Sequence, residues 1–281
     1  MNIEKASNII KDDTQKISDR MRALFYLRNE ETDTSSLFIE QAFDSTSVLL
    51  KHEAAYVLGQ MRREVSIPKL IDVLLNKNED EIVRHEAGEA LGNYNTRNDI
   101  VNALEIGTKD GSIPVRETCF LALKNLNSNY VSPYGSRDPA KSRNFSFEEA
   151  CFVFLNSNDL YERYQAMFFL RNLNNDEAVK ILGQGFKDTS SLFKHEISFV
   201  FGQMKNIKSV PFLIEMMEKE NEHGMVRHEC AEALGIIGTK ECLCELIKYK
   251  NSECDILRES VEVAMDLHGY INSKESEYCV V

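Results

Sequence analysis

The chain carries the same motifs twice at a constant spacing, and this internal repetition limits the folds open to it. His52 recurs as His195 and His85 recurs as His228, and the offset along the chain is the same for both pairs. The flanking residues repeat as well, with KHE and GQM around the first of each pair and VRHE and EALG around the second. Equal offsets at separate motifs indicate a duplication, so we expect two halves of the same architecture.

A shorter period divides each half. The spacing from His52 to His85 equals that from His195 to His228, and it corresponds to a unit of roughly 30–35 residues, the length typical of helical repeats. A unit of this length accommodates two helices and two turns, and the segment 67–77 has apolar residues at helical spacing. We therefore predict an all-α fold, an α-solenoid of eight HEAT-like helical pairs in two pseudo-symmetric halves. In such a fold each pair stacks only on its neighbours, and the second helix of a pair lines the concave side.

The composition along the chain indicates where the halves begin and end. Two of the five prolines gather with Ser, Asn and Gly in the segment 128–145, which is typical of a linker. We predict an N-terminal half of four helical pairs at 1–127 and a C-terminal half of four pairs at 146–270. The segment 271–281 is predicted to be a flexible tail.

The charge balance excludes several classes of partner. Asp and Glu number 45 against 33 Lys and Arg, which gives a formal net charge of −12. Such an excess repels phosphate backbones, so we expect no nucleic acid as partner and favour a basic protein. No apolar run approaches the roughly 18 residues of a membrane span. The polar N-terminus lacks a signal core, and the seven cysteines form no CxxC pair, so we expect reduced thiols, no membrane association and a cytoplasmic location.

Four of the six histidines are followed directly by glutamate, and all four dyads fall at the same place in the repeat. They occupy only the two middle repeats of each half, whereas a purely structural dyad would recur in every repeat. Imidazole and carboxylate together are the ligand set of non-haem iron. The predicted metal ligands are His52, Glu53, His85, Glu86, His195, Glu196, His228 and Glu229.

The two equal sets of dyads predict two metal ions. Neighbouring helices of a solenoid are close enough for the two histidines of one half to converge on one ion. If the halves face each other, all eight residues enclose both ions, and the carboxylates neutralise them. The mixed nitrogen and oxygen donors, without cysteine, argue against structural zinc and favour iron, with manganese also possible.

Two further acids lie one helical turn beyond a dyad. Glu89 follows His85 by four residues, and Glu232 follows His228 by four, so each shares a face with its histidine. We predict that these two acids bind the substrate, as an anionic wall for ammonium groups, although a solvated or supporting role is equally open. Tyr56 stands in the same relation to His52 and is expected to pack beside the site.

The four motifs KHEAAYVLGQ, VRHEAGEALG, KHEISFVFGQ and VRHECAEALG resemble those of the deoxyhypusine hydroxylase family, over about residues 1–270. The resemblance implies a monooxygenase with two iron ions that uses O₂ as co-substrate. Its partner would be translation initiation factor 5A carrying deoxyhypusine, whose side chain is hydroxylated to complete hypusine. The resemblance implies the eight dyad residues as iron ligands and no catalytic residue beyond them.

Two other functions remain open on the sequence. A HEAT-repeat scaffold would bind protein partners through its concave face without any metal. A di-metal hydrolase would use the same ligands with zinc and would need no O₂. Metal analysis of the purified protein distinguishes all three.

Overall fold

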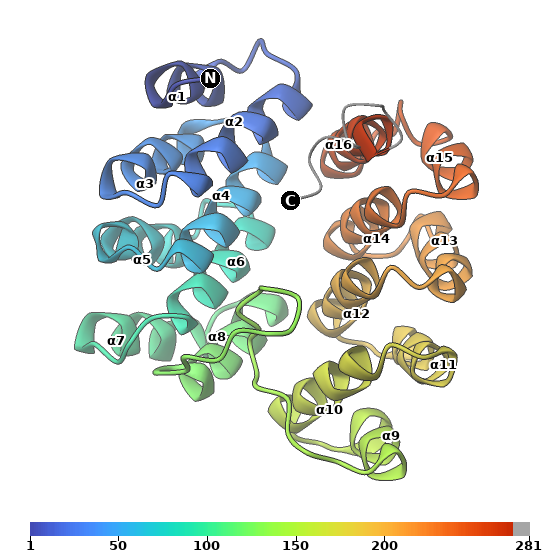
Figure 1. Ribbon diagram of the computed structural model, residues 1–281. Helices are drawn as coiled ribbons and strands as arrows, with labels where there is room; N and C mark the ends of the chain where they lie inside the picture. The colour runs from blue at the N-terminus through green and yellow to red at the C-terminus, as the bar shows by residue number, and fades with distance from the viewer. Residues whose placement is uncertain (272–281) are drawn as a thin grey trace. The chain divides into compact units, whose positions relative to one another are not determined.

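The computed structural model describes residues 1–271, and within them the chain is all-helical (Figure 1). Sixteen α-helices form eight consecutive pairs, which confirms the predicted fold class. All but the first residue of the predicted tail, 271–281, lie outside the described residues. No helix of the described part is both long enough and apolar enough to cross a bilayer.

The helices are short, and in every pair the second helix is longer than the first. The first four pairs are α1 (Ile3–Lys11), α2 (Ile17–Asn29), α3 (Asp33–Ile39), α4 (Val48–Met61), α5 (Ile67–Leu75), α6 (Glu81–Gly92), α7 (Asn98–Gly107) and α8 (Ile113–Asn125). The last four pairs are α9 (Phe147–Asn156), α10 (Leu160–Leu173), α11 (Asp176–Gln184), α12 (Ser191–Met204), α13 (Val210–Glu218), α14 (Gly224–Ile237), α15 (Lys240–Ile247) and α16 (Asp255–Ile271).

The chain divides into two compact units. The first comprises Met1–Arg143 with Asn158–Gln165, and the second comprises Asn144–Ser157 with the chain from Ala166 onward. In the first unit the second helices α2, α4, α6 and α8 pack one on the next, and the first helices form a layer beside them (Figure 1). In the second unit α12, α14 and α16 pack in the same way, with α13 and α15 against them. All four dyads therefore lie on second helices.

The helices that carry the dyads begin at side-chain caps. Ser47 and Ser190 accept the backbone N–H of the residue three positions later, at the starts of α4 and α12. Asp80 caps α6 by accepting the Ile82 N–H, and His223 caps α14 by accepting the Met225 N–H on Nδ1. His223 is thus a half-buried capping residue.

Two glycines in the dyad helices allow close helix packing. A Cβ on Gly59 of α4 would lie 2.7 Å from the Ala90 Cα on α6. A Cβ on Gly202 of α12 would lie 3.3 Å from the Ala233 Cα on α14. The dyad helices of each unit therefore approach each other closely at these points, backbone against backbone.

The segment predicted to be a linker contains an ordered loop of the first unit. The Ser132 N–H donates to the Ser136 carbonyl over 2.8 Å, and the Ser136 hydroxyl donates to Asp138 over 2.7 Å. The amide side chain of Gln60, on α4, accepts the Arg137 N–H at 2.9 Å and donates to its carbonyl at 3.3 Å. Ser132, Ser136 and Asp138 are buried. The loop is thus hydrogen-bonded to a dyad helix rather than extended in solvent.

Candidate metal centre

In the first unit the dyads of α4 and α6 lie against each other. The imidazole rings of His52 and His85 are 5.5 Å apart between centroids and are tilted by 43°. His52 Nδ1 lies 3.3 Å from Glu53 Oε1, and its Nε2 lies 3.3 Å from Glu86 Oε2. All four residues are buried, with His85 fully so. Two predicted dyads are therefore brought into one buried cluster.

The electrostatics of this cluster favour positive charge. Burial by itself lowers the pKa of His52, but the hydrogen bonds and negative charges of Glu53 and Glu86 outweigh it and hold the pKa well above its usual range. Carboxylates that stabilise a proton on the ring stabilise a metal cation by the same attraction. A cluster of this kind is therefore suited to a cation.

In the second unit the dyads of α12 and α14 have nearly the same geometry. The rings of His195 and His228 are 5.5 Å apart and tilted by 42°, and His195 Nε2 lies 3.4 Å from Glu229 Oε2. His195, His228 and Glu229 each offer a ligand atom, and these atoms lie within 4.8 Å of one another. Glu196 is buried on the same helix as His195.

The donor sets fit a first-row transition metal. In the first unit His85, Glu86 and Glu89 offer ligand atoms within 4.8 Å of one another, and the second unit offers the set given above. Each set combines imidazole with carboxylate and contains no thiolate, which is the ligand pattern of non-haem iron rather than of a structural zinc site.

The acids one turn beyond the dyads also border these clusters. Glu232 Oε1 lies 3.5 Å from His228 Nδ1 and accepts a hydrogen bond from the Ser260 hydroxyl at 3.1 Å. Glu89 belongs to the cluster with His85. The pKa of Tyr56 is raised, mainly by burial and further by the charges of nearby carboxylates, including that of Glu89. Tyr56 thus lies beside the acids, as predicted.

Sequence reasoning missed the lysine that precedes the first dyad histidine of each half. Lys51 forms an ion pair of 2.5 Å with Glu79, and Lys194 forms one of 2.5 Å with Glu222. Both pairs are largely buried. The second pair follows the first at the same offset that separates the dyads of the two halves. The duplication itself was the signal that could have identified both ion pairs, which lie in the first turns of α4 and α12, next to the dyads.

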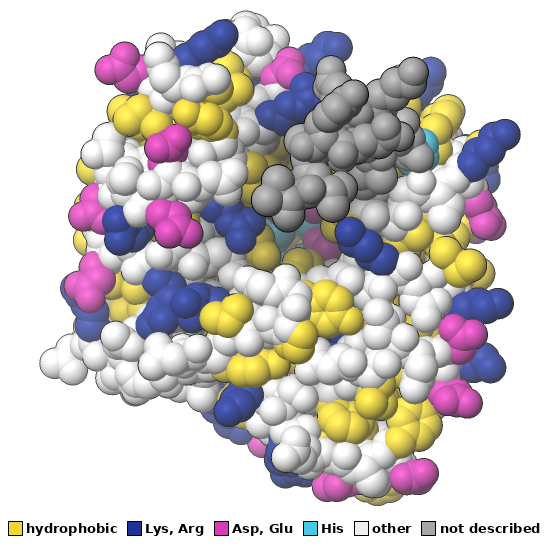
Figure 2. Space-filling view, in the orientation of Figure 1, with side chains coloured by type: hydrophobic (Ala, Val, Ile, Leu, Met, Phe, Trp, Pro, Cys, Tyr) yellow, Lys and Arg dark blue, Asp and Glu magenta, His cyan; other side chains and the backbone are white. Residues whose placement is uncertain are grey.

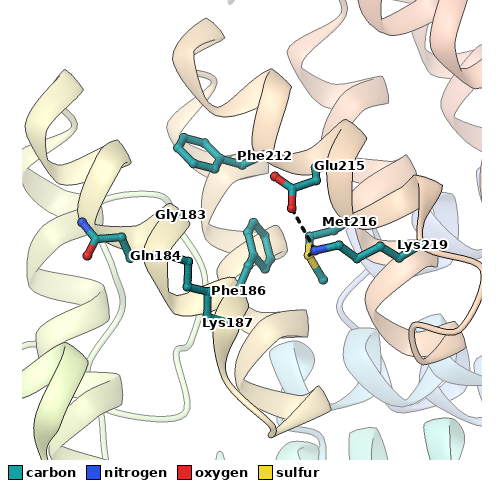
Figure 3. Close-up of a pocket in the computed structure, with 8 residues that line it drawn as sticks. All are labelled: Gly183, Gln184, Phe186, Lys187, Phe212, Glu215, Met216 and Lys219. Atoms are coloured by element: carbon teal, nitrogen blue, oxygen red, sulfur yellow. Dashed lines mark hydrogen bonds and ion pairs between the residues drawn. The ribbon is translucent and has the colours of Figure 1, made fainter.

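A separate cavity of about 160 Å³, which no dyad residue lines, lies in the second unit (Figure 3). The aromatic rings of Phe186 and Phe212 line it, and Glu215 forms an ion pair of 2.9 Å with Lys219 at its edge. It contains none of the predicted ligands. The cavity is therefore not part of the candidate metal centre.

The fold and the clusters define the class: an all-helical HEAT-repeat protein in which paired clusters of histidine and glutamate have the donor atoms for a metal ion. Residues 32–129 match the family model for HEAT repeats, and residues 226–252 match the model for the PBS lyase HEAT-like repeat.

Relatives extend the match over nearly the whole chain. The chain is 42% identical to the deoxyhypusine hydroxylase of Danio rerio, over 98% of this chain and 94% of the relative. It is 42% identical to that of Candida albicans, over 97% and 93%, and 39% identical to that of Homo sapiens, over 98% and 94%. The solved structure of human deoxyhypusine hydroxylase in complex with glycerol superposes with a TM-score of 0.90 at 38% identity, covering 95% of this chain and 96% of that one.

The chain belongs to the deoxyhypusine hydroxylase family. This confirms the family expected from the four motifs, and with it the prediction that the chain is an enzyme of the monooxygenase class.

Proposed function

We propose that the protein hydroxylates the deoxyhypusine side chain of translation initiation factor 5A, using two iron ions and O₂, and thereby completes hypusine. Family membership supports the reaction, and the paired clusters of imidazole and carboxylate support the metal. The reaction requires such a metal because the attacked C–H bond is not acidic and no protein side chain oxidises it. Bound iron would supply the activation of O₂.

The ligands follow from the dyads. One iron ion would be held by His52 and His85 with their neighbouring glutamates Glu53 and Glu86. The other would be held by the corresponding residues of the second unit, which are His195, Glu196, His228 and Glu229. The burial of these side chains excludes water from the donors, and the ion pairs Lys51–Glu79 and Lys194–Glu222 hold the helices that present them.

Glu89 and Glu232 would bind the substrate. Deoxyhypusine is a lysine extended by an aminobutyl group, so it carries two ammonium groups. A carboxylate beside each histidine pair is the complementary charge, and the net charge of −12 would steer a basic partner toward the protein. In this proposal the two acids orient the side chain by charge-assisted hydrogen bonds, while the dyads hold the metal.

The single observation that carries the proposal is that each unit gathers buried histidine and glutamate ligands with the same geometry. Protein expressed with added iron should contain about two irons per chain and should hydroxylate a deoxyhypusine-bearing acceptor in the presence of O₂. A scaffold would contain no metal. A hydrolase would bind zinc and would act without O₂. Either result contradicts the proposal.

The role of Glu89 and Glu232 is tested separately. Glu89→Gln and Glu232→Gln should each retain iron but bind the acceptor about ten- to a hundredfold more weakly, because a charge-assisted hydrogen bond contributes roughly 1.5–3 kcal/mol. Glu105→Gln, an exposed change on α7, is the control and should bind like the parent. Unaltered binding by both variants would assign the two acids a role other than substrate binding.

We also propose that the protein acts in the cytoplasm. The six cysteines in the described residues are all free, which fits a reducing compartment.

A further inference from the structure

A second cavity, distinct from the dyad clusters, opens in the first unit where α4 and α6 end and α5 and α7 begin. It has a volume of about 270 Å³ and is lined mainly by polar groups, among them Arg62, Arg97 and Arg137. Arg62 follows α4, Arg97 precedes α7, and Arg137 belongs to the ordered loop that is hydrogen-bonded to Gln60. On the face shown in Figure 2, several Lys and Arg side chains lie over α5–α7, with Asp and Glu side chains among them. Three guanidinium groups around one cavity are unexpected in a protein of net charge −12.

The first two arginines differ in their partners. Arg97 is neutralised by Asp99 at 2.8 Å and by Glu64 at 3.3 Å. Arg62 donates to neutral amide oxygens, those of Asn129 at 3.2 Å and Asn95 at 3.3 Å, and pairs with no carboxylate among the described residues.

Arg137 has no carboxylate partner within the described part of the chain, and its buried Nη1 has no hydrogen-bond partner there. Within residues 1–271, two of the three positive charges therefore have no anion to balance them.

This arrangement is unfavourable for the protein alone. Burial lowers the pKa of the Arg137 guanidinium, and the nearby charge of Arg62 lowers it further, which shows that both effects oppose its positive charge. A buried guanidinium N–H without an acceptor also costs free energy. An anion between the two side chains would remove both penalties at once.

The backbone holds the two arginines in place. The Gln60 side chain makes two hydrogen bonds to the backbone of Arg137, at 2.9 Å and 3.3 Å, and these hold the backbone of Arg137 beside the end of α4. Arg62 occupies the left-handed region at φ 54°, a conformation that non-glycine residues rarely adopt. This backbone conformation sets the direction in which the Arg62 side chain leaves the chain. The site is therefore preorganised.

We propose that this cavity binds a small phosphate-type oxyanion through Arg62 and Arg137. A phosphate group offers three or more oxygens and up to two negative charges, which matches two forked guanidinium groups better than a single planar carboxylate does. The cavity has room for an organic group as well, so the anion is either free phosphate or a small phosphate monoester.

The test measures binding of inorganic phosphate and of glycerol 3-phosphate to the full chain by calorimetry, with potassium chloride at equal ionic strength as reference. Arg62→Gln and Arg137→Gln should each weaken binding about tenfold or more, because each removes a charged hydrogen-bond donor. Arg63→Gln is the matched control, since Arg63 pairs with Asp33 at 3.2 Å outside the cavity and the variant should bind like the parent.

A second readout separates anion binding from a structural role. Phosphate should raise the melting temperature of the parent and of Arg63→Gln, but not that of the two cavity variants. Iron content should be the same in all four proteins. If Arg137→Gln does not fold, Arg62→Gln still decides the matter, because the Arg62 side chain is partly exposed.

Three results would overturn the proposal. The first is parent protein that binds both phosphates no better than chloride. The second is binding that survives in Arg62→Gln and Arg137→Gln. The third is binding of succinate in preference to either phosphate, which would make the site a dicarboxylate site. Tighter binding of glycerol 3-phosphate than of inorganic phosphate would support the proposal and identify the monoester as the physiological kind of ligand.

Discussion

The two units present their histidines in the same way but support them differently. Ring separation is 5.5 Å in both, the tilts are 43° and 42°, and the cross-helix contact between imidazole and glutamate is 3.3 Å in one unit and 3.4 Å in the other. The buried lysine ion pair before each cluster is also duplicated. After duplication, the geometry around the proposed metal has thus been retained in both copies.

The two units differ at the arginine that directly precedes the second dyad histidine of each unit. Arg84 and Arg227 each donate through Nε to a carbonyl near the end of the preceding helix, at 3.1 Å and 2.9 Å. In the first unit the guanidinium also pairs with buried Asp110, whereas in the second it lies 6.0 Å above the ring of Tyr249. The difference teaches that the contact supporting a dyad helix can change from an ion pair to a cation–π contact while the geometry of the histidines stays the same.

The largest expected effect tests the equivalence of the two clusters. His52→Ala and His195→Ala should each lose metal and reduce activity at least about 100-fold, since even residues that only support metal ligands matter ten- to a hundredfold. Iron content and hydroxylation rate are measured for both. The comparison fails if one variant keeps two irons per chain and near-parent activity while the other loses them.

The next largest effect compares the contact that supports Arg84 with the contact that supports Arg227. Asp110→Asn leaves the Arg84 guanidinium buried without its carboxylate, so the free energy of unfolding should fall by about 3–5 kcal/mol at pH 7. Tyr249→Leu in the second unit should cost only about 1 kcal/mol, because a partly exposed cation–π contact is weak. Urea unfolding of the parent and of the two variants measures both changes in the free energy of unfolding.

The stability difference between the parent and Asp110→Asn should depend on pH in a direction that the pKa of Asp110 determines. Burial would raise the pKa of Asp110, but hydrogen bonds from Arg84 and Lys77 outweigh it and hold the pKa well below its ordinary value of 3.8. A carboxyl group whose pKa is lower in the folded protein than in the unfolded chain stabilises the fold at pH values above the pKa of the unfolded chain. This stabilisation is lost as the pH falls toward the lower pKa of the folded protein. The stability gap between parent and Asp110→Asn should therefore shrink below about pH 4. A constant gap would contradict this.

Much of this organisation follows from local sequence pattern. The short period within each half, the helical spacing of apolar residues and the repeated dyads predict the eight helical pairs and the histidine clusters, because each is a pattern that recurs along the chain.

The contacts that sequence reasoning missed join residues far apart in the chain. Arg84 and Asp110 belong to different helical pairs, and no period of the sequence connects them. Arg62 and Arg137 line one cavity because the loop around Arg137 is hydrogen-bonded to Gln60. The Ser, Asn and Pro content that is typical of a linker also suits a loop built on short polar side chains, so composition does not distinguish the two.

A smaller effect is expected when the close packing of α4 on α6 is compared with that of α12 on α14. Gly59→Ala would place its methyl group 2.7 Å from the Ala90 Cα, and overpacking of this kind costs about 1–3 kcal/mol. At Gly202 the same change meets Ala233 at 3.3 Å, and the higher helix propensity of alanine, up to about 1 kcal/mol, offsets the strain. Thermal unfolding should show a clear loss for the first variant and little change for the second. Equal losses would mean that the two approaches are equally tight.

The smallest effect concerns how Glu232 is held. The Ser260 hydroxyl, buried on α16, donates to Glu232 at 3.1 Å, whereas the buried hydroxyl of Thr118 on α8 has no hydrogen-bond partner among the described residues. Ser260→Ala should therefore weaken acceptor binding about fivefold, since one partly exposed hydrogen bond to a carboxylate contributes roughly 1 kcal/mol. Thr118→Val removes a hydroxyl that makes no bond within the described part and should leave binding unchanged, with iron content at the parent level in both. Equal weakening in both variants would show that these positions act through helix packing, because only Ser260 reaches the acid that is proposed to bind substrate.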